Sequence, residues 1–135
     1  MLENYCKTVR IEAQTMINMV HKRIAPAITR FTADLARQAS EKKALFPSLA
    51  CNYETELVTK LSNLTDCITA RVDAREDAVL ALQDAKDILE ESTLIRDTVL
   101  PKMQELREPC DKAELLTAKT YWPFPTYGDI LFSVK

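Results

Sequence analysis

The sequence predicts an all-α fold, an elongated antiparallel bundle of three long helices followed by an irregular tail. Three observations support this prediction. Apolar residues recur at steps of three and four along most of the chain, as they do on one face of a helix. The 135 residues include one Gly, far below the roughly 7 % of an average protein, so the glycines that sheet turns need are missing. The final stretch, residues 121–135, holds five of the nine aromatic residues and two of the six prolines.

The first predicted helix covers residues 3–42. Its apolar face is formed by Val9, Ala13, Met16, Val20, Ile24, Ala27, Phe31 and Leu35. Pro26 lies inside this helix and should bend it rather than end it, because the apolar pattern resumes beyond the proline. Residues 43–52 contain Pro47 and lose the helical pattern, which predicts a connecting loop.

The second predicted helix covers residues 52–87, and Asn52 suits its N-cap. Its apolar face is formed by Leu57, Leu61, Leu64, Ile68, Val72, Val79, Leu82 and Ala85. No Gly or Pro ends this helix. The best break is the pair Asp87 and Glu90, a D-x-x-E capping box that favours a new helix start, with Ser92 as a rival cap.

The third predicted helix covers residues 88–120. Pro101 and Pro109 interrupt its pattern, so we expect it to be kinked or locally 3₁₀. Short connections between long amphipathic helices predict antiparallel neighbours. A helix of about 35 residues spans roughly 50 Å, so the product should be a rod rather than a globule.

The chain therefore divides into a helical bundle over residues 1–120 and a non-helical tail over residues 121–135. Prolines prevent the tail from continuing the helix, and the tail is too apolar to remain free in water. It should dock either onto the helices of this chain, which we favour, or onto a surface outside it. The aromatic candidates for this contact are Tyr121, Trp122, Phe124, Tyr127 and Phe132.

One level of the rod should combine several unusual residues. Folding the helices back on one another places three stretches side by side, residues 19–26, 68–75 and 101–108. Arg71 and Arg75 lie at this level in rows that otherwise carry apolar residues, with Glu105 and Glu108 nearby. One interpretation is a polar waist that meets a partner, which makes both arginines candidate interaction residues. The simpler interpretation is that both guanidinium groups reach solvent while their stems cover apolar surface.

The composition argues against several classes of function. The net charge of −2 gives no basis for binding nucleic acid, and no apolar run approaches the roughly 18 residues of a membrane span. The four cysteines form no CxxC pair, which is typical of reduced thiols in a cytosolic protein. One Gly cannot build a phosphate-binding loop, and one His cannot supply the paired Glu-x-x-His motifs of a di-iron bundle. We therefore predict no catalytic, cofactor-binding or metal-binding residue.

Three blocks of sequence resemble the C-terminal region of type III glutamine synthetases. They are Thr8–Ala13 with Met16, Ile17 and Ile24–Ala27; Arg96–Arg107; and Ala118–Phe132, whose WPFPTYGD run is the most specific. The blocks follow the family's order and cover almost the whole chain. Residues 40–92 match only in helical character.

This resemblance implies that the chain is a fragment of a larger enzyme of glutamine biosynthesis and nitrogen metabolism. Such enzymes join glutamate and ammonia, using ATP and a divalent metal, within ring-shaped cytoplasmic oligomers. The catalytic domain is missing here, so the resemblance carries over no catalytic residue and no cofactor site. It implies a non-catalytic domain for subunit packing or regulation, whose partners are the catalytic domain and neighbouring subunits. The alternative is a free-standing helical adaptor or coiled-coil interaction module.

Overall fold

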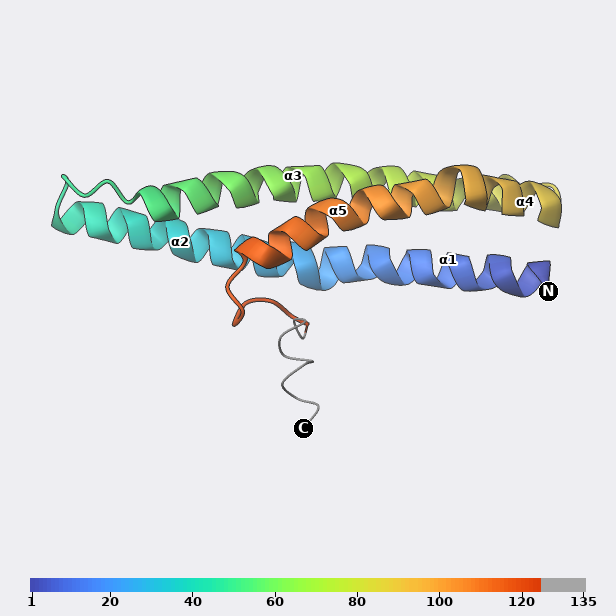
Figure 1. Cartoon of the computed structure of the whole chain (residues 1–135), viewed down its shortest axis with the longest axis horizontal. Helices are drawn as coiled ribbons and strands as arrows, with labels where there is room; N and C mark the ends of the chain where they lie inside the picture. The colour runs from blue at the N-terminus through green and yellow to red at the C-terminus, as the bar shows by residue number, and fades with distance from the viewer. Residues whose placement is uncertain (125–135) are drawn as a thin grey trace, which may run out of the picture.

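The structure, a computed structural model of the chain, describes residues 1–124. Within this range it consists of three long helical runs and contains no strand. Neighbouring runs along the chain are antiparallel, so the molecule is a rod with the N-terminus at one end and the first interhelical loop at the other (Figure 1). The predicted elongated, antiparallel, all-α bundle is confirmed.

The first helical run consists of α1 (Leu2–Met19), the π-helical turn η1 (Val20–Ile24) and α2 (Ala25–Leu45). It extends slightly further at both ends than the predicted residues 3–42. Its buried face is formed by Cys6, Val9, Ala13, Ile17, Val20, Ile24, Ala27, Ile28, Phe31 and Leu35. The helical period of the sequence therefore specifies which side of this run faces the bundle.

The second run consists of α3 (Asn52–Ala81) and the 3₁₀ turn η2 (Leu82–Asp84). Asn52 is the first helical residue rather than the N-cap that we predicted. The N-cap is Cys51, which has a left-handed backbone with φ 51° and makes no capping hydrogen bond with its side chain. The run also ends before the predicted residue 87, because the backbone at Ala85 is already extended.

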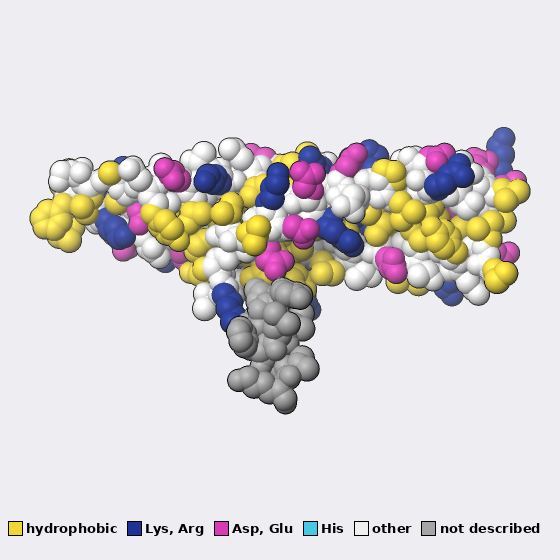
Figure 2. All heavy atoms as spheres, viewed as in Figure 1, with side chains coloured by type: hydrophobic (Ala, Val, Ile, Leu, Met, Phe, Trp, Pro, Cys, Tyr) yellow, Lys and Arg dark blue, Asp and Glu magenta, His cyan; other side chains and the backbone are white. Residues whose placement is uncertain are grey.

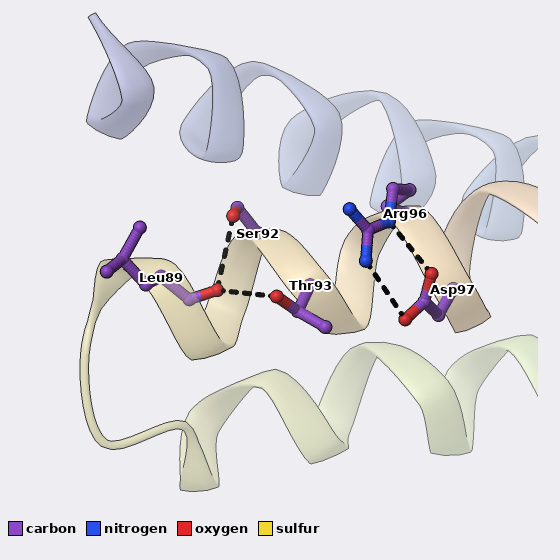
Figure 3. Close-up of polar contacts among 5 residues, drawn as sticks. All are labelled: Leu89, Ser92, Thr93, Arg96 and Asp97. Atoms are coloured by element: carbon purple, nitrogen blue, oxygen red, sulfur yellow. Dashed lines mark hydrogen bonds and ion pairs between the residues drawn. The ribbon is translucent and has the colours of Figure 1, made fainter.

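The third run consists of α4 (Ile88–Leu94), the π-helical turn η3 (Ile95–Val99) and α5 (Leu100–Leu116). Asp87 caps its start, as the D-x-x-E pattern predicts, because the Asp87 carboxylate accepts a hydrogen bond of 2.8 Å from the Glu90 N–H. Ser92 is not a cap. Its hydroxyl and that of Thr93 both donate to the Leu89 carbonyl inside the helix (Figure 3).

This cap supports a stability prediction. Replacing Asp87 with Ala should lower the free energy of unfolding by about 1 kcal/mol, because the first turn of α4 loses a hydrogen-bond acceptor. Replacing Ser92 with Ala should change it by less than about 0.5 kcal/mol, since that hydroxyl only duplicates a contact within the helix. Urea unfolding followed by circular dichroism would measure both values. Equal losses in the two variants would contradict the assignment of Asp87 as the cap.

Both prolines near the middle of the rod follow a π-helical turn. We predicted a kink or a 3₁₀ segment in the third run, and the 3₁₀ alternative is wrong. A proline lacks the N–H that would bond to the carbonyl four residues earlier, and its ring crowds that carbonyl. In each π turn the residue just before the proline donates five residues back, Ala25 to Val20 and Leu100 to Ile95. The wider turn therefore accommodates Pro26 and Pro101 without ending the run.

Pro109 lies inside α5 and does not interrupt it. The helix ends at Leu116, four residues before the predicted end at residue 120, because the backbone at Thr117 is extended.

The interior consists of two apolar clusters along the rod. The larger one fills the space between α2, α3 and α5 and includes Phe31, Leu35, Leu61, Ile68, Leu106 and Trp122. The smaller one lies toward the N-terminal end and includes Cys6, Val9, Ala78, Leu82, Ile95 and Val99. Val20 and Ile24 of η1 belong to the larger cluster, Ile95 and Val99 of η3 belong to the smaller one, and Arg75 belongs to neither.

Candidate interaction site

The first residues of the tail fold back onto the bundle. Two turn hydrogen bonds follow α5, from the Tyr121 N–H to the Ala118 carbonyl and from the Trp122 N–H to the Lys119 carbonyl. The Tyr121 ring lies against Phe31 of α2, with 5.0 Å between the ring centroids.

The Tyr121 hydroxyl also donates to the carboxylate of Asp34 on α2. Trp122 is 9 % exposed and joins the larger apolar cluster. Its ring meets Phe124 edge to face, with 6.4 Å between the centroids. Tyr127 and Phe132, the other two aromatic candidates, lie outside the described residues.

The contact between Tyr121 and Asp34 should make stability depend on pH. Hydrogen bonds from Tyr121 and Arg37 hold the pKa of the Asp34 carboxyl below its ordinary value. Because the pKa of Asp34 is lower in the folded state, the contact stabilises the folded protein at pH values above the ordinary Asp pKa, near 3.9. This stabilisation is lost as the pH falls through the lowered pKa of the folded state. Tyr121→Phe should therefore lower the melting temperature at pH 7, and the difference from the natural chain should shrink in acid. Melting curves from pH 7 to about pH 2 would test this. A difference that stays constant with pH would contradict the proposed role of this pair.

A groove of about 560 Å³ lies between α1 and α5. Its apolar lining comprises Met16, Met19, Ile24, Met103, Trp122 and Phe124. Four charged residues, Glu12, Arg107, Asp111 and Glu114, also line it. Figure 2 shows hydrophobic side chains exposed along the boundary between α1 and the third run. The start of the tail thus contributes one wall of an open, largely apolar groove.

Arg75 is completely buried next to Met16 and does not itself line this groove. None of its surface is exposed, and among residues 1–124 the only acceptor it reaches is the Met16 sulfur, 3.1 Å from Nη1. Its Nε and Nη2 atoms have no hydrogen-bond partner within the part of the chain that the structure describes. Burial, and the neighbouring positive charge of Arg107, lower the pKa of Arg75 to about 10. The side chain is therefore still charged at neutral pH.

Arg71 and Arg75 have different environments although they lie one helical turn apart. The Arg71 guanidinium reaches the surface, where it donates to the Glu105 carbonyl and lies 3.9 Å from the Glu108 carboxylate. The interpretation that both arginines reach solvent is therefore wrong for Arg75. Arg75 is buried because it lies on the side of α3 that faces both α1 and α5. Arg71 lies at the edge of α5, where its guanidinium group reaches solvent.

Contacts between the helices show which residues lie side by side at the level of the rod where we predicted unusual residues to meet. Arg71 meets Glu105 of α5, Arg75 meets Met16 of α1, and His21 of η1 contacts Glu76 of α3. Sequence reasoning missed Arg107 and the methionines as members of one site. A signal was available, since Met16, Met19 and Met103 are the three internal methionines and all lie close to this level.

Residues 1–124 contain no group of three or more His, Cys, Asp or Glu side chains arranged to hold a metal ion. Within the same range, none of the helices has the length and apolar character of a membrane-crossing segment.

All four cysteines are free thiols. Burial raises the pKa of the Cys110 thiol, which lies in the groove lining, to about 11, so this thiol is protonated at neutral pH.

Comparison with known proteins gives matches over the entire chain. The family model of the glutamine synthetase C-terminal domain matches residues 1–43. A glutamine synthetase of Butyrivibrio fibrisolvens is 30 % identical over 135 residues, which is 100 % of this chain and 19 % of that protein. The type-3 glutamine synthetase of Dictyostelium discoideum is 24 % identical over 136 residues, covering 98 % of this chain and 18 % of that protein.

A glutamine synthetase of Bacteroides fragilis (strain YCH46) is 23 % identical over 138 residues, covering 98 % of this chain and 19 % of that protein. The chain thus spans about a fifth of the length of the curated relatives that it matches.

Proposed function

Because this chain is related to the C-terminal domain of glutamine synthetases, we propose that it is the non-catalytic packing domain of a longer synthetase. The proposed parent enzyme joins glutamate and ammonia with ATP and a divalent metal. The observation that carries this proposal is the extent of the matches, which cover 98–100 % of this chain but only 18–19 % of each relative. The remaining four-fifths of such a protein leaves ample length for a catalytic body.

The surface of the rod supports a role in packing. The end formed by the loop between α2 and α3 exposes four large apolar side chains, those of Leu45, Phe46, Leu49 and Tyr53. Single exposed apolar residues are common, but a group of four at one end is costly unless another surface covers it. We propose that this apolar tip, Leu45, Phe46, Leu49 and Tyr53, contacts the catalytic body or a neighbouring subunit.

Deleting this domain from the longer synthetase tests the proposal. The enzyme that lacks this domain should no longer form its largest oligomer, because the packing contacts are absent. Light scattering would measure the oligomer mass. The domain alone should form no glutamine from glutamate, ammonia and ATP. Unchanged assembly mass after deletion would refute the packing role. A reading frame without a catalytic region would instead favour the free-standing adaptor.

A double substitution in the tip separates packing from folding. Phe46→Ser with Leu49→Ser should change the stability of the isolated domain by less than about 0.5 kcal/mol per site, because both side chains are exposed. The same change in the longer enzyme should weaken its assembly, so that the mass falls on dilution. A matched substitution of the exposed Leu80 on α3, which lies away from the tip, should leave the assembly intact.

A further inference from the structure

We propose that the groove between α1 and α5 is the docking site of a basic amphipathic helix from a partner chain. The apolar face of the partner helix would rest on the methionine and aromatic side chains of the groove, and its lysine or arginine residues would pair with carboxylates on both walls. This inference concerns a partner of the domain itself and stands independently of the proposed packing role.

The length of the groove fits a short helix. Its lining follows the first helical run from Ile11 to Ile24, and it follows α5 from Met103 to Glu114. At 1.5 Å per residue these two walls are about 20 Å and about 17 Å long, the length of a helix of roughly three to four turns. The first and third runs point in the same direction along the rod, so the two walls continue together (Figure 1).

The two walls belong to helices that pack mainly on other elements. The helix α1 packs against α3, α4 and η3, and the main neighbour of α5 outside its own run is α3. Apolar side chains on the groove side of both helices are therefore left partly uncovered, and Ile11 on the α1 wall is 56 % exposed. A further helix laid between α1 and α5 would cover them in the manner of a four-helix bundle.

The volume of the groove admits one face of a helix but not a whole helix. The groove measures about 560 Å³, whereas a helix about 20 Å long and 10 Å wide occupies roughly 1,500 Å³. The partner's backbone would therefore stay outside, and its side chains at positions i, i+3, i+4 and i+7 would enter. Met16, Met19 and Met103 line the space, and such flexible side chains can adapt their shape to these anchors.

The charges of the lining select a basic partner. Three carboxylates, those of Glu12, Asp111 and Glu114, and one guanidinium group, that of Arg107, give the lining a net charge of −2. Within residues 1–124 none of the three carboxylates takes part in an ion pair. Glu12 lies on the α1 wall and the other two lie on α5, so cations on both flanks of a partner's apolar face would meet a carboxylate. An acidic helix would place like charges together and would be repelled.

A peptide of about 14 residues built from leucine and lysine, about 21 Å long as a helix, is the probe. One control peptide has glutamate in place of every lysine, and another has the original composition in an order that is not amphipathic. Trp122 is the only tryptophan and lines the groove, so its fluorescence reports on binding, and titration calorimetry gives dissociation constants. The lysine peptide should bind about tenfold or more tightly than either control peptide.

Removing carboxylates from the groove tests the role of charge. Asp111→Asn combined with Glu114→Gln should weaken binding of the lysine peptide about fivefold, because two partly exposed ion pairs are lost. The matched control is Asp73→Asn combined with Asp77→Asn. It changes the net charge equally at exposed positions of α3 outside the groove, so the affinity should stay the same.

A substitution in the apolar wall tests the role of burial. Ile11→Ser should weaken binding of the lysine peptide about fivefold, because Ile11 would be covered only when the partner helix is bound. Leu80→Ser is the matched control, since Leu80 is 57 % exposed and does not line this groove. Both side chains are exposed in the free domain, so both variants should fold.

Absence of binding by the lysine peptide, equal affinity for the lysine and glutamate peptides, or an affinity unaffected by both groove substitutions would overturn the proposal. Light scattering would show whether the free chain is a dimer, and a dimer that Ile11→Ser dissociates would assign the groove to a second copy instead. Octylammonium that binds as tightly as the lysine peptide would make the groove a small-molecule site, which also contradicts the proposal. These outcomes leave the packing role untouched, because the measurement uses the isolated domain.

Discussion

Replacing Trp122 with Ala should lower the free energy of unfolding of this domain by about 3–5 kcal/mol, the usual cost of truncating a buried tryptophan. Trp122 follows the last helix, yet it is 9 % exposed and belongs to the larger apolar cluster with Leu106 and Cys110. The substitution removes a large apolar surface from the core and from the lining of the α1–α5 groove. Urea unfolding followed by circular dichroism at 222 nm is the appropriate measurement, because the variant has no tryptophan fluorescence.

Leu115→Ala is the matched control for this prediction. Leu115 is also a large apolar residue near the end of α5, but it is 85 % exposed. Its substitution should change stability by less than about 0.5 kcal/mol. Ending the chain after Lys119 should cost at least as much as Trp122→Ala, since it also removes the Tyr121 contacts with Phe31 and Asp34. If both tail changes were as mild as Leu115→Ala, the aromatic residues would instead serve a surface outside this chain.

Periodicity predicted the arrangement of the helices well. Phe31 and Leu35 lie in the interior, as the apolar steps of three and four require, and the capping box correctly marked Asp87. The register across the bundle also followed from the lengths of the helices, because short loops leave antiparallel neighbours little freedom to slide. The contact between Arg71 and Glu105 is an example.

The backbone at the prolines could not be predicted in the same way. Pro26 and Pro101 signal a disturbance, but a bend, a 3₁₀ turn and a π turn all remove the crowded carbonyl. Packing on both sides of the disturbance selects among them. The π turns keep Val20, Ile24, Ile95 and Val99 buried, which a simple break in either helix would not.

The groove and the burial of Arg75 could not be predicted from the sequence, for a different reason. A charged residue on an apolar face is normally expected to reach water, and Arg71 does so. Arg75 lies one turn further along α3, where it contacts Met16 of α1 and is influenced by Arg107 of α5. Arg71 instead contacts Glu105 and Glu108 of α5 at the surface.

Replacing Arg75 with Met should raise the free energy of unfolding by about 1–4 kcal/mol, the range observed when buried charged groups are replaced by apolar residues of similar volume. The natural residue keeps a charge in the interior, with two nitrogens that find no partner in residues 1–124 and with the charge of Arg107 acting on it. Met can occupy the same space beside Met16 without that desolvation cost. Melting curves and urea unfolding of the isolated domain would measure the gain.

Arg71→Met is again the matched control, because its guanidinium is partly solvated and should contribute less than about 1 kcal/mol. A loss of stability in Arg75→Met would mean that the Met16 contact and the packing of the arginine stem outweigh the cost of burying the charge. A gain in stability would mean that the desolvation cost of the buried charge outweighs that packing.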